Sequence, residues 1–322
     1  MKKTIFCIML LVVLSSCYED YIHDYDYSAI YFAYQTDVRT FVVGEGMKIK
    51  VNAALAGVRE NKRDREVNFA VVNSFVTQDI LTEMKNSSYD YIKSSVASVN
   101  TLLPIPSDYY TISHSSKMVI ESGLHFGGVT IQADSAKFLA DAATRSATYA
   151  IPFNITNADA DTIPDSKRTS VIGLKYENML FGNYWHGGVT VVKDASGNEV
   201  ETIRYYTNIP SPESQIMTLM TVGPHALVTN RISNVAGSFM LTLGADGTIT
   251  VEKAATSGIA VSNDGACTFN RAKLLQDRKI FLNYKYENDN GTTSYATDTL
   301  TFRNRIRDGV NEWQDENPDN YK

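Results

Sequence analysis

Apolar and polar residues alternate along most of this chain, and this period of two constrains its fold more than any other feature. In residues 47–57, Met47, Ile49 and Val51 share one face of an extended strand, with polar residues between them. Successive side chains of a strand point to opposite faces, so the pattern indicates a strand with one buried face. Further runs of this kind cover residues 29–34, 67–75, 108–113, 117–122, 127–133, 147–156 and 169–176. Many short strands separated by turns predict an all-β sandwich over residues 29–178.

The strand rhythm restarts near residue 180. The expected strands are residues 183–192, 200–208, 215–223, 237–244, 248–254, 266–270, 279–287 and 292–304. The turns between them include GADGT and ENDNGT, whose Asp-Gly and Asn-Gly pairs readily adopt the positive φ of tight hairpins. Strands joined in sequence by tight turns predict an antiparallel meander or a barrel over residues 179–322, since closure removes exposed edges.

Residues 76–103 interrupt the strand pattern. Apolar residues recur there at spacings near three and four, which predicts one or two short helices. A further helical turn is expected over residues 134–142, with Asp134 or Ser135 as its N-cap.

The first 16 residues have the layout of a secretory signal peptide. Lys2 and Lys3 precede an unbroken apolar run from Ile5 to Leu14, about half the length that a membrane span requires. The sequence Leu-Ser-Ser-Cys, which ends at Cys17, resembles the lipobox of bacterial lipoproteins. That resemblance implies diacylglycerol on the Cys17 thiol, cleavage before this residue, and acylation of the new amino group by a fatty acid such as palmitate.

Residues 17–28 alternate tyrosine with acidic residues and are expected to form a tether. Glu19 and Asp20 resemble the acidic export signal that sends Bacteroidetes lipoproteins to the outer face of the outer membrane. The expected location is therefore the outer membrane, lipid-anchored and facing the exterior. The alternatives are an ordinary secretory signal with a chance cysteine, and a tether that is merely hydrophilic.

Charge and cysteine content narrow the remaining classes. Removal of the signal peptide takes Lys2 and Lys3 away and moves the formal charge from −6 to −8. Such a protein has no general electrostatic attraction to nucleic acid, so no nucleic-acid partner is expected. Cys7 would be cleaved off and Cys17 lipidated, which leaves Cys267 without an intramolecular disulfide partner.

Signatures of catalysis are missing from the sequence. The chain contains no nucleophile elbow, zinc-protease motif, P-loop or dinucleotide fingerprint. Its five histidines show no metal-ligand spacing. A pair of carboxylates for glycoside hydrolysis needs only closeness in space, so a cryptic glycosidase stays an alternative. The prediction is a non-enzymatic protein with no catalytic residues, no metal and no cofactor.

Several segments together resemble a two-domain family of Bacteroidetes surface lipoproteins of largely unknown function. The segments in the first half are AIYFA, LLPIPSDYYTIS, GLHFGGVTI and ATYAIPFNITNA; those in the second half are FGNYWHGG and ATDTLTFRNRIRDGVNEW. The resemblance implies an N-terminal immunoglobulin-like β-sandwich followed by a C-terminal lipocalin-like β-barrel. Residues 76–103 are longer and more polar than this family leads one to expect.

The same resemblance implies a role on the cell surface. Members of the family are often encoded beside outer-membrane glycan importers in polysaccharide-utilisation loci. The expected partners are thus the membrane, through the N-terminal lipid, a glycan or polysaccharide, and an importer complex.

The segment GNYWHGG contains the first candidate binding residues. Gly182 and Trp185 resemble the glycine–tryptophan signature of lipocalin-like barrels, in which a late arginine, here Arg303 or Arg305, covers the indole. Packing at the closed end of the barrel is the favoured role of Trp185, since buried tryptophans usually serve packing. Alternatively Tyr184, Trp185 and His186 form one platform, with rings that stack on sugars and polar groups that bond their hydroxyls.

Pairs of tyrosines are the second set of candidates. They are Tyr89 and Tyr91, Tyr109 and Tyr110, and Tyr205 and Tyr206. In adjacent strand positions one ring points inward and the other outward, so at most half can be exposed. The sequence therefore predicts a lipid-anchored surface protein that binds extracellular glycan for an import system. The alternative is a surface adhesin or a structural subunit that binds a protein partner.

Overall fold

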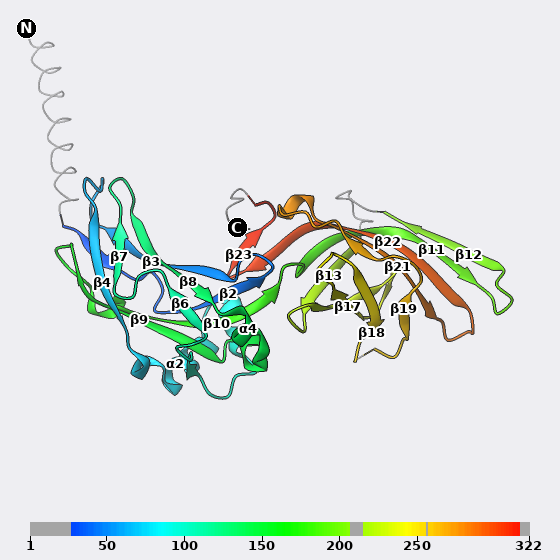
Figure 1. The fold of residues 1–322 in the computed structure, drawn as a ribbon, viewed down its shortest axis with the longest axis horizontal. Coiled ribbons are helices and arrows are strands. Elements are labelled where there is room, and N and C mark those ends of the chain that lie inside the picture. Colours follow the sequence, from blue (N-terminus) through cyan, green and yellow to red (C-terminus); the bar gives the residue numbers. More distant parts are fainter. Residues whose placement is uncertain (1–26, 207–214, 256, 316–322) are drawn as a thin grey trace, which may run out of the picture.

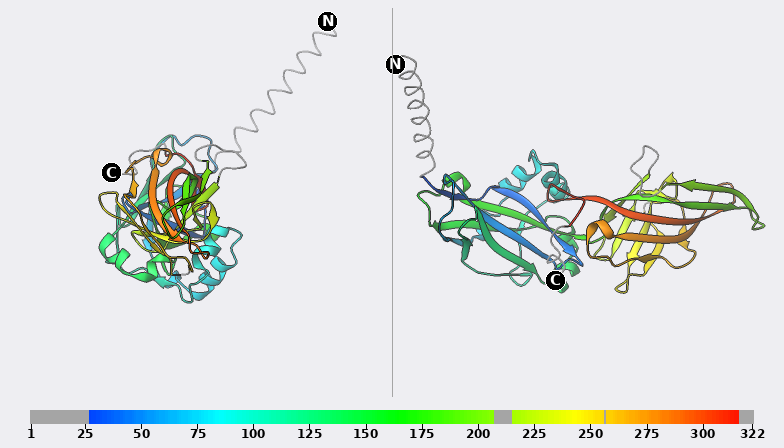
Figure 2. Two further views of the ribbon diagram at one scale, coloured as in Figure 1. Left: turned by 90° about the vertical axis from the view of Figure 1, so that its right-hand side faces the viewer. Right: turned by 90° about the horizontal axis from the view of Figure 1, so that it is seen from above.

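The computed structural model describes residues 27–206, 215–255 and 257–315, so the predicted signal peptide and Cys17 lie outside the described residues. Figures 1 and 2 show two β-rich units arranged end to end. One hydrophobic core uses residues from Ile30 to Tyr176, and another uses residues from Leu180 to Phe302. Within the described residues, no helix has both the length and the apolar character to cross a membrane.

The first unit is a sandwich of two facing sheets. One sheet has the order β1 (Ala29–Tyr31), β3 (Lys48–Ala56), β8 (Phe126–Ala133) and β6 (Tyr110–Ile112). The other has the order β2 (Thr36–Val43), β10 (Thr169–Asn178), β9 (Tyr149–Ala158), β4 (Arg65–Val71) and β7 (Lys117–Ile120), with β5 (Leu103–Pro104) beside β9. Both β1 and β2 are edge strands, and β1 is also hydrogen-bonded to the segment before β10, where the amide of Ile30 donates to the carbonyl of Thr162 at 3.1 Å.

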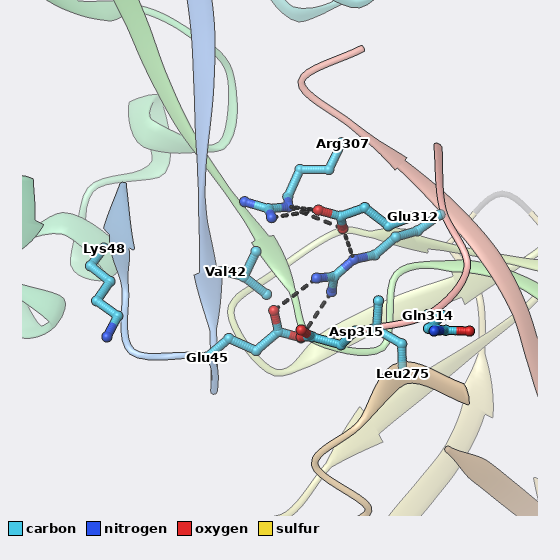
Figure 3. Close-up of a pocket in the computed structure, with 9 residues that line it drawn as sticks. Val42, Glu45, Lys48, Leu275, Arg307, Glu312, Gln314 and Asp315 are labelled. Atoms are coloured by element: carbon cyan, nitrogen blue, oxygen red, sulfur yellow. Dashed lines mark hydrogen bonds and ion pairs between the residues drawn. The ribbon is translucent and has the colours of Figure 1, made fainter. Parts of the chain in front are cut away.

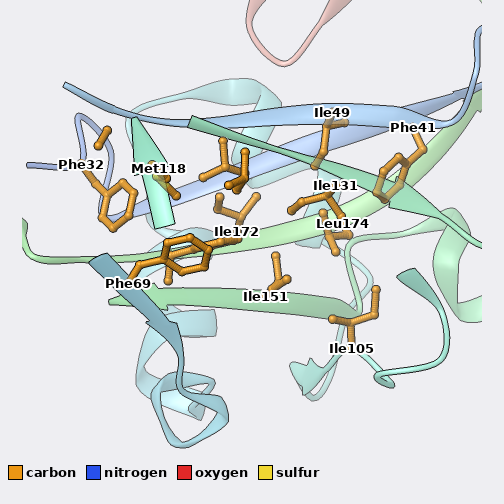
Figure 4. Packing of buried hydrophobic residues seen from close by; sticks show 14 of the residues in the cluster. Phe32, Phe41, Ile49, Phe69, Ile105, Met118, Ile131, Ile151, Ile172 and Leu174 are labelled. Carbon is orange, nitrogen blue, oxygen red and sulfur yellow. The ribbon is translucent and has the colours of Figure 1, made fainter. Parts of the chain in front are cut away.

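The alternation in the sequence correctly predicts which side chains fill the sandwich core. Met47, Ile49 and Val51 are buried, whereas Lys50 is exposed. Aromatic and branched side chains from both sheets fill the space between the layers in Figure 4, with Ile49 and Ile131 from one sheet and Ile151 and Leu174 from the other. Each fully buried large apolar side chain contributes about 1.5–3 kcal/mol, and this burial holds the sheets face to face.

Short helices cover the outer face of the β2 sheet. They are η1 (Asn73–Phe75), α2 (Gln78–Lys85) and α3 (Asp90–Val96), so the prediction of helices within residues 76–103 is confirmed. Thr77 caps α2 by accepting a hydrogen bond from the amide of Ile80. The predicted cap Asp134 likewise begins α4 (Ser135–Ala140), which is followed by η2 (Ala142–Arg145); η3 (Asp165–Lys167) precedes β10.

The second unit is a strongly curved sheet of 11 strands, with antiparallel pairing throughout the described ladder. Its main path is β18 (Ile249–Lys253), β17 (Phe239–Leu243), β14 (Ala226–Thr229), β13 (Gln215–Thr221), β11 (Gly182–Lys193), β22 (Thr293–Arg307), β21 (Lys279–Glu287) and β19 (Val261–Asn263). Three strands pair beside this path: β12 (Glu199–Tyr205) with β11, β20 (Thr268–Phe269) with β21, and β23 (Val310–Glu312) with β22. The short strands β15 (Arg231–Ile232) and β16 (Val235–Ala236) pair with each other, and η4 (Leu275–Asp277) precedes β21.

Backbone hydrogen bonds nearly close this sheet into a barrel. The amide of Ile249 donates to the carbonyl of Cys267 at 2.9 Å, and the amide of Phe269 donates to the carbonyl of Gly247 at 2.8 Å. Gly247 and Gly291 lie in the two predicted hairpin turns and have φ of 90° and 77°. The all-β fold expected from the sequence is therefore confirmed, with a sandwich first and a barrel-like sheet second.

Buried ion pairs join the two units. Glu45, just after the end of β2, accepts hydrogen bonds from Arg305 at 2.9 and 2.8 Å, which are drawn as dashed lines in Figure 3. It also accepts a hydrogen bond from Arg278 at 2.7 Å. Arg305 also donates to Glu312 at 2.6 Å. Burial alone would raise the pKa of Glu45, but the two arginines outweigh it and hold this pKa below its ordinary value. Glu45 is therefore charged in the folded protein over a wider range of pH than a free glutamate.

Candidate functional site

The three neighbours Tyr184, Trp185 and His186 do not form the common platform considered from the sequence. They are consecutive residues of β11, so their side chains alternate across the barrel wall. Tyr184 and His186 are fully buried inside the barrel, and Trp185 lies half-buried on its outer face. The platform is therefore wrong, because the wall of the barrel separates its members.

Trp185 is covered by an arginine, as the lipocalin resemblance implies. The guanidinium of Arg303 lies 4.9 Å from the centre of the indole ring. Arg305, the other candidate, binds Glu45 instead. Gly182 has a φ of 137°, and a side chain there would come within 2.9 Å of the carbonyl of Asn304. Since the arginine occupies a face of the ring, Trp185 is poorly placed to stack on a sugar.

The tyrosine pairs named as candidates do not converge either. Tyr205 is buried in the barrel and donates to Asp298, whereas Tyr206 is 60% exposed. Tyr109 and Tyr110 belong to the sandwich and are half-buried against its core. The Tyr109 hydroxyl donates to a carboxylate in its own unit. These four residues thus lie in different units, and three of them pack against the protein, which leaves only Tyr206 largely exposed.

A buried cluster of polar side chains lies inside the barrel. Asp298 accepts a 2.7 Å hydrogen bond from the hydroxyl of Tyr284 and another from Tyr205. The Nε2 atom of His186 lies 2.9 Å from Asp298, at an ion-pair distance but not aligned for a hydrogen bond. A side chain on Gly188 would come within 2.7 Å of the Asp298 carboxylate, so the glycine makes room for it. This cluster is sealed from solvent and serves the barrel itself.

An open groove lies at the edge of the sandwich, between β2 and β3 and beside the first residue of β8. Two aromatic residues flank it: Tyr34 is 48% exposed and Phe126 is 62% exposed. Polar side chains line it, namely Asp37, Arg39, Lys50, Asn52 and Ser170. Its volume is about 170 Å³. We call this feature the edge groove.

Hydrogen bonds fix the acidic wall of the edge groove. Asp37 accepts from the Tyr91 hydroxyl at 2.7 Å and from the amide of Val38 at 2.8 Å. The Nε atom of Arg39 lies 3.7 Å from Asp37, and its guanidinium donates to the carbonyl of Lys50 at 3.3 Å. Burial raises the pKa of Asp37, although the Tyr91 hydroxyl and Arg39 oppose this effect. The groove thus offers fixed donors and acceptors.

The helical segment extends the aromatic rim of the edge groove. Tyr34 and Tyr89 meet edge to face with their ring centres 5.8 Å apart, and Tyr89 lies 6.0 Å from Tyr91. Tyr89 and Tyr91 were candidates from the sequence, whereas Tyr34 and Phe126 were missed. The latter two lie about 90 positions apart, and only the folded chain brings them to one edge.

One other pocket is a weaker candidate. The pocket beside Glu45 in Figure 3 has a volume of about 110 Å³, but Arg305 and Arg307 in its wall both donate to Glu312. Its charged groups are therefore satisfied by the protein. In the part of the chain that the structure describes, no three His, Cys, Asp or Glu side chains are grouped to hold a metal ion.

Comparisons with known proteins agree with this fold and leave the function open. A family model described as an N-terminal domain matches residues 25–162, which is less than half of the chain. A solved Bacteroides ovatus protein of unknown function is 22% identical, with a TM-score of 0.62 over 90% of this chain and 98% of its own. At that identity the likeness establishes a shared fold.

More distant solved structures come from the same organism. One Bacteroides ovatus protein of unknown function is 12% identical, with a TM-score of 0.43 over 89% of this chain and 100% of its own. Another, described as a multidomain protein including DUF1735, is 11% identical, with a TM-score of 0.42 over the same shares. The chain matches none of the curated proteins. Its similarity is thus to Bacteroides proteins of unknown function.

Proposed function

We propose that this protein binds an extracellular glycan in the edge groove and performs no reaction on it. The observation that carries this proposal is the combination of exposed Tyr34 and Phe126 rings with the fixed polar groups of Asp37 and Arg39 and the neighbouring amide of Asn52. A sugar ring has one C–H-rich face that stacks on aromatic rings and hydroxyls that need donors and acceptors. The edge groove supplies both kinds of contact side by side.

The acids of the edge groove favour binding over hydrolysis. Among the described residues that line it, Asp37 is the single carboxylate. Most glycoside hydrolases use two carboxyl groups that flank the scissile bond. Asp37 is also held by Tyr91 and Val38, which suits an acceptor that orients a hydroxyl. A cryptic glycosidase would require a second acid that this groove does not contain.

The proposed setting is the outer face of the outer membrane. Lipid on Cys17, followed by the tether, would keep the groove close to an outer-membrane importer and raise the local concentration of captured glycan. Replacing Cys17 with serine should abolish both labelling by a radioactive fatty acid and sedimentation with membranes. Retention of both would contradict the lipid anchor.

The test of glycan binding uses the mature ectodomain, residues 18–322, against a panel of polysaccharides and released glycans. Tyr34→Ala and Phe126→Ala should each weaken a selective hit by about 1–3 kcal/mol, by analogy with stacking on nucleobases. The matched control is Tyr206→Ala, because Tyr206 is equally exposed but lies on the barrel. A panel without any hit, or equal losses in all three variants, would refute the edge groove as a glycan site.

One observation favours the alternative of a protein partner. Within the described sheet, β12 pairs with β11 alone, and Val200 on it is 56% exposed. An unpaired strand edge can add a strand from another chain. Cross-linking and pull-down from intact outer membranes would detect such a partner, and Val200→Pro should abolish its capture while leaving glycan binding unchanged.

A further inference from the structure

A second groove lies where the two units meet, and the hydrogen bond from Tyr91 to Asp37 links it to the edge groove. Its wall combines Tyr91 and Ser94 of α3, Lys175 of β10, and Ile306 and Asp308 from the end of β22. Its volume is about 340 Å³. Ile306 is 62% exposed, so an apolar surface is open to a ligand there. We call this feature the junction groove.

Shared hydrogen bonds connect the two grooves. Tyr91 lines the junction groove and donates to Asp37, which lines the edge groove. Asp308 of the junction groove accepts from the Thr40 hydroxyl at 2.6 Å and lies 3.9 Å from the Arg39 guanidinium of the edge groove. One polar bridge therefore forms part of the wall of both sites.

The junction groove exists only because the two units touch. The turn between β22 and β23 contains Asp308 and Gly309, with φ of 53° and 76°, as expected of an Asp-Gly hairpin turn. This turn rests on α3, because a side chain on Gly309 would come within 2.8 Å of the Tyr91 ring. A ligand in this groove would contact both units at once.

The size of the grooves indicates how long the ligand is. Sites for small ligands usually have volumes of about 300–1,000 Å³. The edge groove, at about 170 Å³, falls below that range, whereas the junction groove, at about 340 Å³, lies within it. A short sugar would fill the edge groove, and a longer chain is needed to reach the junction groove.

The charges of the grooves indicate what kind of chain fits. Lys175 binds Glu177 at 2.9 Å, and Arg307 binds Glu312 at 2.5 Å. Arg39 lies between Asp37 and Asp308. Most cations of the two grooves are thus already neutralised by carboxylates of the protein, which favours hydroxyl-rich neutral ligands over sulfated or uronic-acid chains.

From these observations, and resting on the proposed function, we infer that the ligand is a neutral oligosaccharide long enough to occupy both grooves. It runs from the rings of Tyr34 and Phe126, past the Asp37–Tyr91 bridge, to the apolar surface of Ile306. Both units hold the same ligand molecule.

The test is a series of oligosaccharides, from disaccharide upward, made from the polysaccharide that binds best. Affinity for the mature ectodomain should rise with length and then level off. Ser94→Trp places a bulky ring in the junction groove and should lower affinity for the long chains about ten-fold, without effect on the shortest. Lys85→Trp, at an exposed position at the end of α2, is the matched control and should change neither.

The outcomes separate the two proposals. Binding that is lost in Tyr34→Ala but does not depend on length or on Ser94→Trp would overturn the junction groove and leave the edge groove intact. Tighter binding of uronic-acid chains of equal length would overturn the neutral ligand. A failure of every chain to bind would overturn the proposed function and this inference together. Circular dichroism and the unfolding midpoint of each variant would show that it folds.

Discussion

Two aspartates in this protein accept hydrogen bonds from tyrosines, yet their surroundings give them different roles. Asp298 lies inside the barrel, 1% exposed, and both of its oxygens are engaged by Tyr205 and Tyr284. Asp37 lies at the wall of the edge groove, 8% exposed, and is bound by a single tyrosine, Tyr91. The tyrosine–aspartate hydrogen bonds are therefore sealed from solvent in the barrel, whereas in the sandwich such a bond borders an open groove.

The comparison shows how to separate a structural polar cluster from a binding site. In the barrel, Tyr205 and Tyr284 from two other strands occupy both oxygens of Asp298, so the protein itself satisfies this carboxylate. At the sandwich edge, the sheet ends at β2, and the neighbouring rings and polar groups face solvent. Exposure of the neighbours, rather than the identity of the acid, decides which cluster can receive a ligand.

The largest effect is expected from Asp298→Ala. The change leaves the buried hydroxyls of Tyr205 and Tyr284 and the imidazole of His186 without their common partner. Each buried donor that loses its acceptor costs about 1–3 kcal/mol, so the loss of both hydroxyl bonds should cost about 3–5 kcal/mol of unfolding free energy. Urea unfolding followed by tryptophan fluorescence would measure it. A loss below about 1 kcal/mol would mean that water or other groups take over these partners.

A smaller loss of stability is expected from Asp37→Ala. Its main partner, the hydroxyl of Tyr91, is only half-buried and can reach water after the change. The loss of one such partner costs about 1–3 kcal/mol. The same urea titration would test the ranking. If Asp37→Ala proved as destabilising as Asp298→Ala, the distinction between an open and a closed cluster would be wrong.

Arg303→Ala should cost still less, about 0.5–1 kcal/mol, since it removes one exposed cation from the Trp185 ring. It also uncovers an aromatic face on the barrel. Glycan affinity, measured by calorimetry, should stay unchanged, because the ring lacks the polar neighbours of the edge groove. A gain in affinity would make the barrel face a second binding surface.

The smallest expected effect is a change of the unfolding free energy with pH. Burial raises the pKa of Asp37 above 3.8, so the folded state binds this proton more tightly than the unfolded state. Its contribution to stability is present below pH 3.8 and is lost as the pH rises through the folded pKa. Glu45 has the opposite sign, because its lowered pKa removes stability as the pH falls below 4.5.

The Asp37→Asn variant separates the pH dependence due to Asp37 from the pH dependence due to Glu45. The amide oxygen can still accept from Tyr91, but the group no longer titrates. The variant should therefore lose less stability than the wild type between pH 4 and pH 7, as measured by thermal unfolding, and keep the decline at more acidic pH that Glu45 causes. Parallel curves for the two proteins would contradict the raised pKa.

The sequence was sufficient for features that depend on neighbouring residues. Alternation correctly assigned Ile49 and Val51 to a core, helical spacing located α2 and α3, and the lipocalin resemblance anticipated Arg303 over Trp185. Each of these depends on a local period, a local turn or one known pairing.

The candidate site required knowledge that a local pattern does not contain. Tyr34 lies in the connection between β1 and β2, and Phe126 begins β8, far away in the chain. Which sheet edges stay open depends on the order of strands. Tyr184, Trp185 and His186 looked like one platform because they are adjacent, but adjacency in a strand is what separates them. Asp298 was missed because its partners come from three other strands.

The seat of the Asp308–Gly309 turn on α3 also has a mechanical consequence. The chain passes from the sandwich into the barrel once, after β10. The turn that follows β22 contacts the sandwich again, where Asp308 accepts a hydrogen bond from Thr40. With the ion pairs of Glu45, the barrel is attached by covalent and non-covalent links in parallel. A force applied to the barrel is therefore shared among these links. The two units should resist bending at their junction, unlike two domains that are joined by one flexible linker.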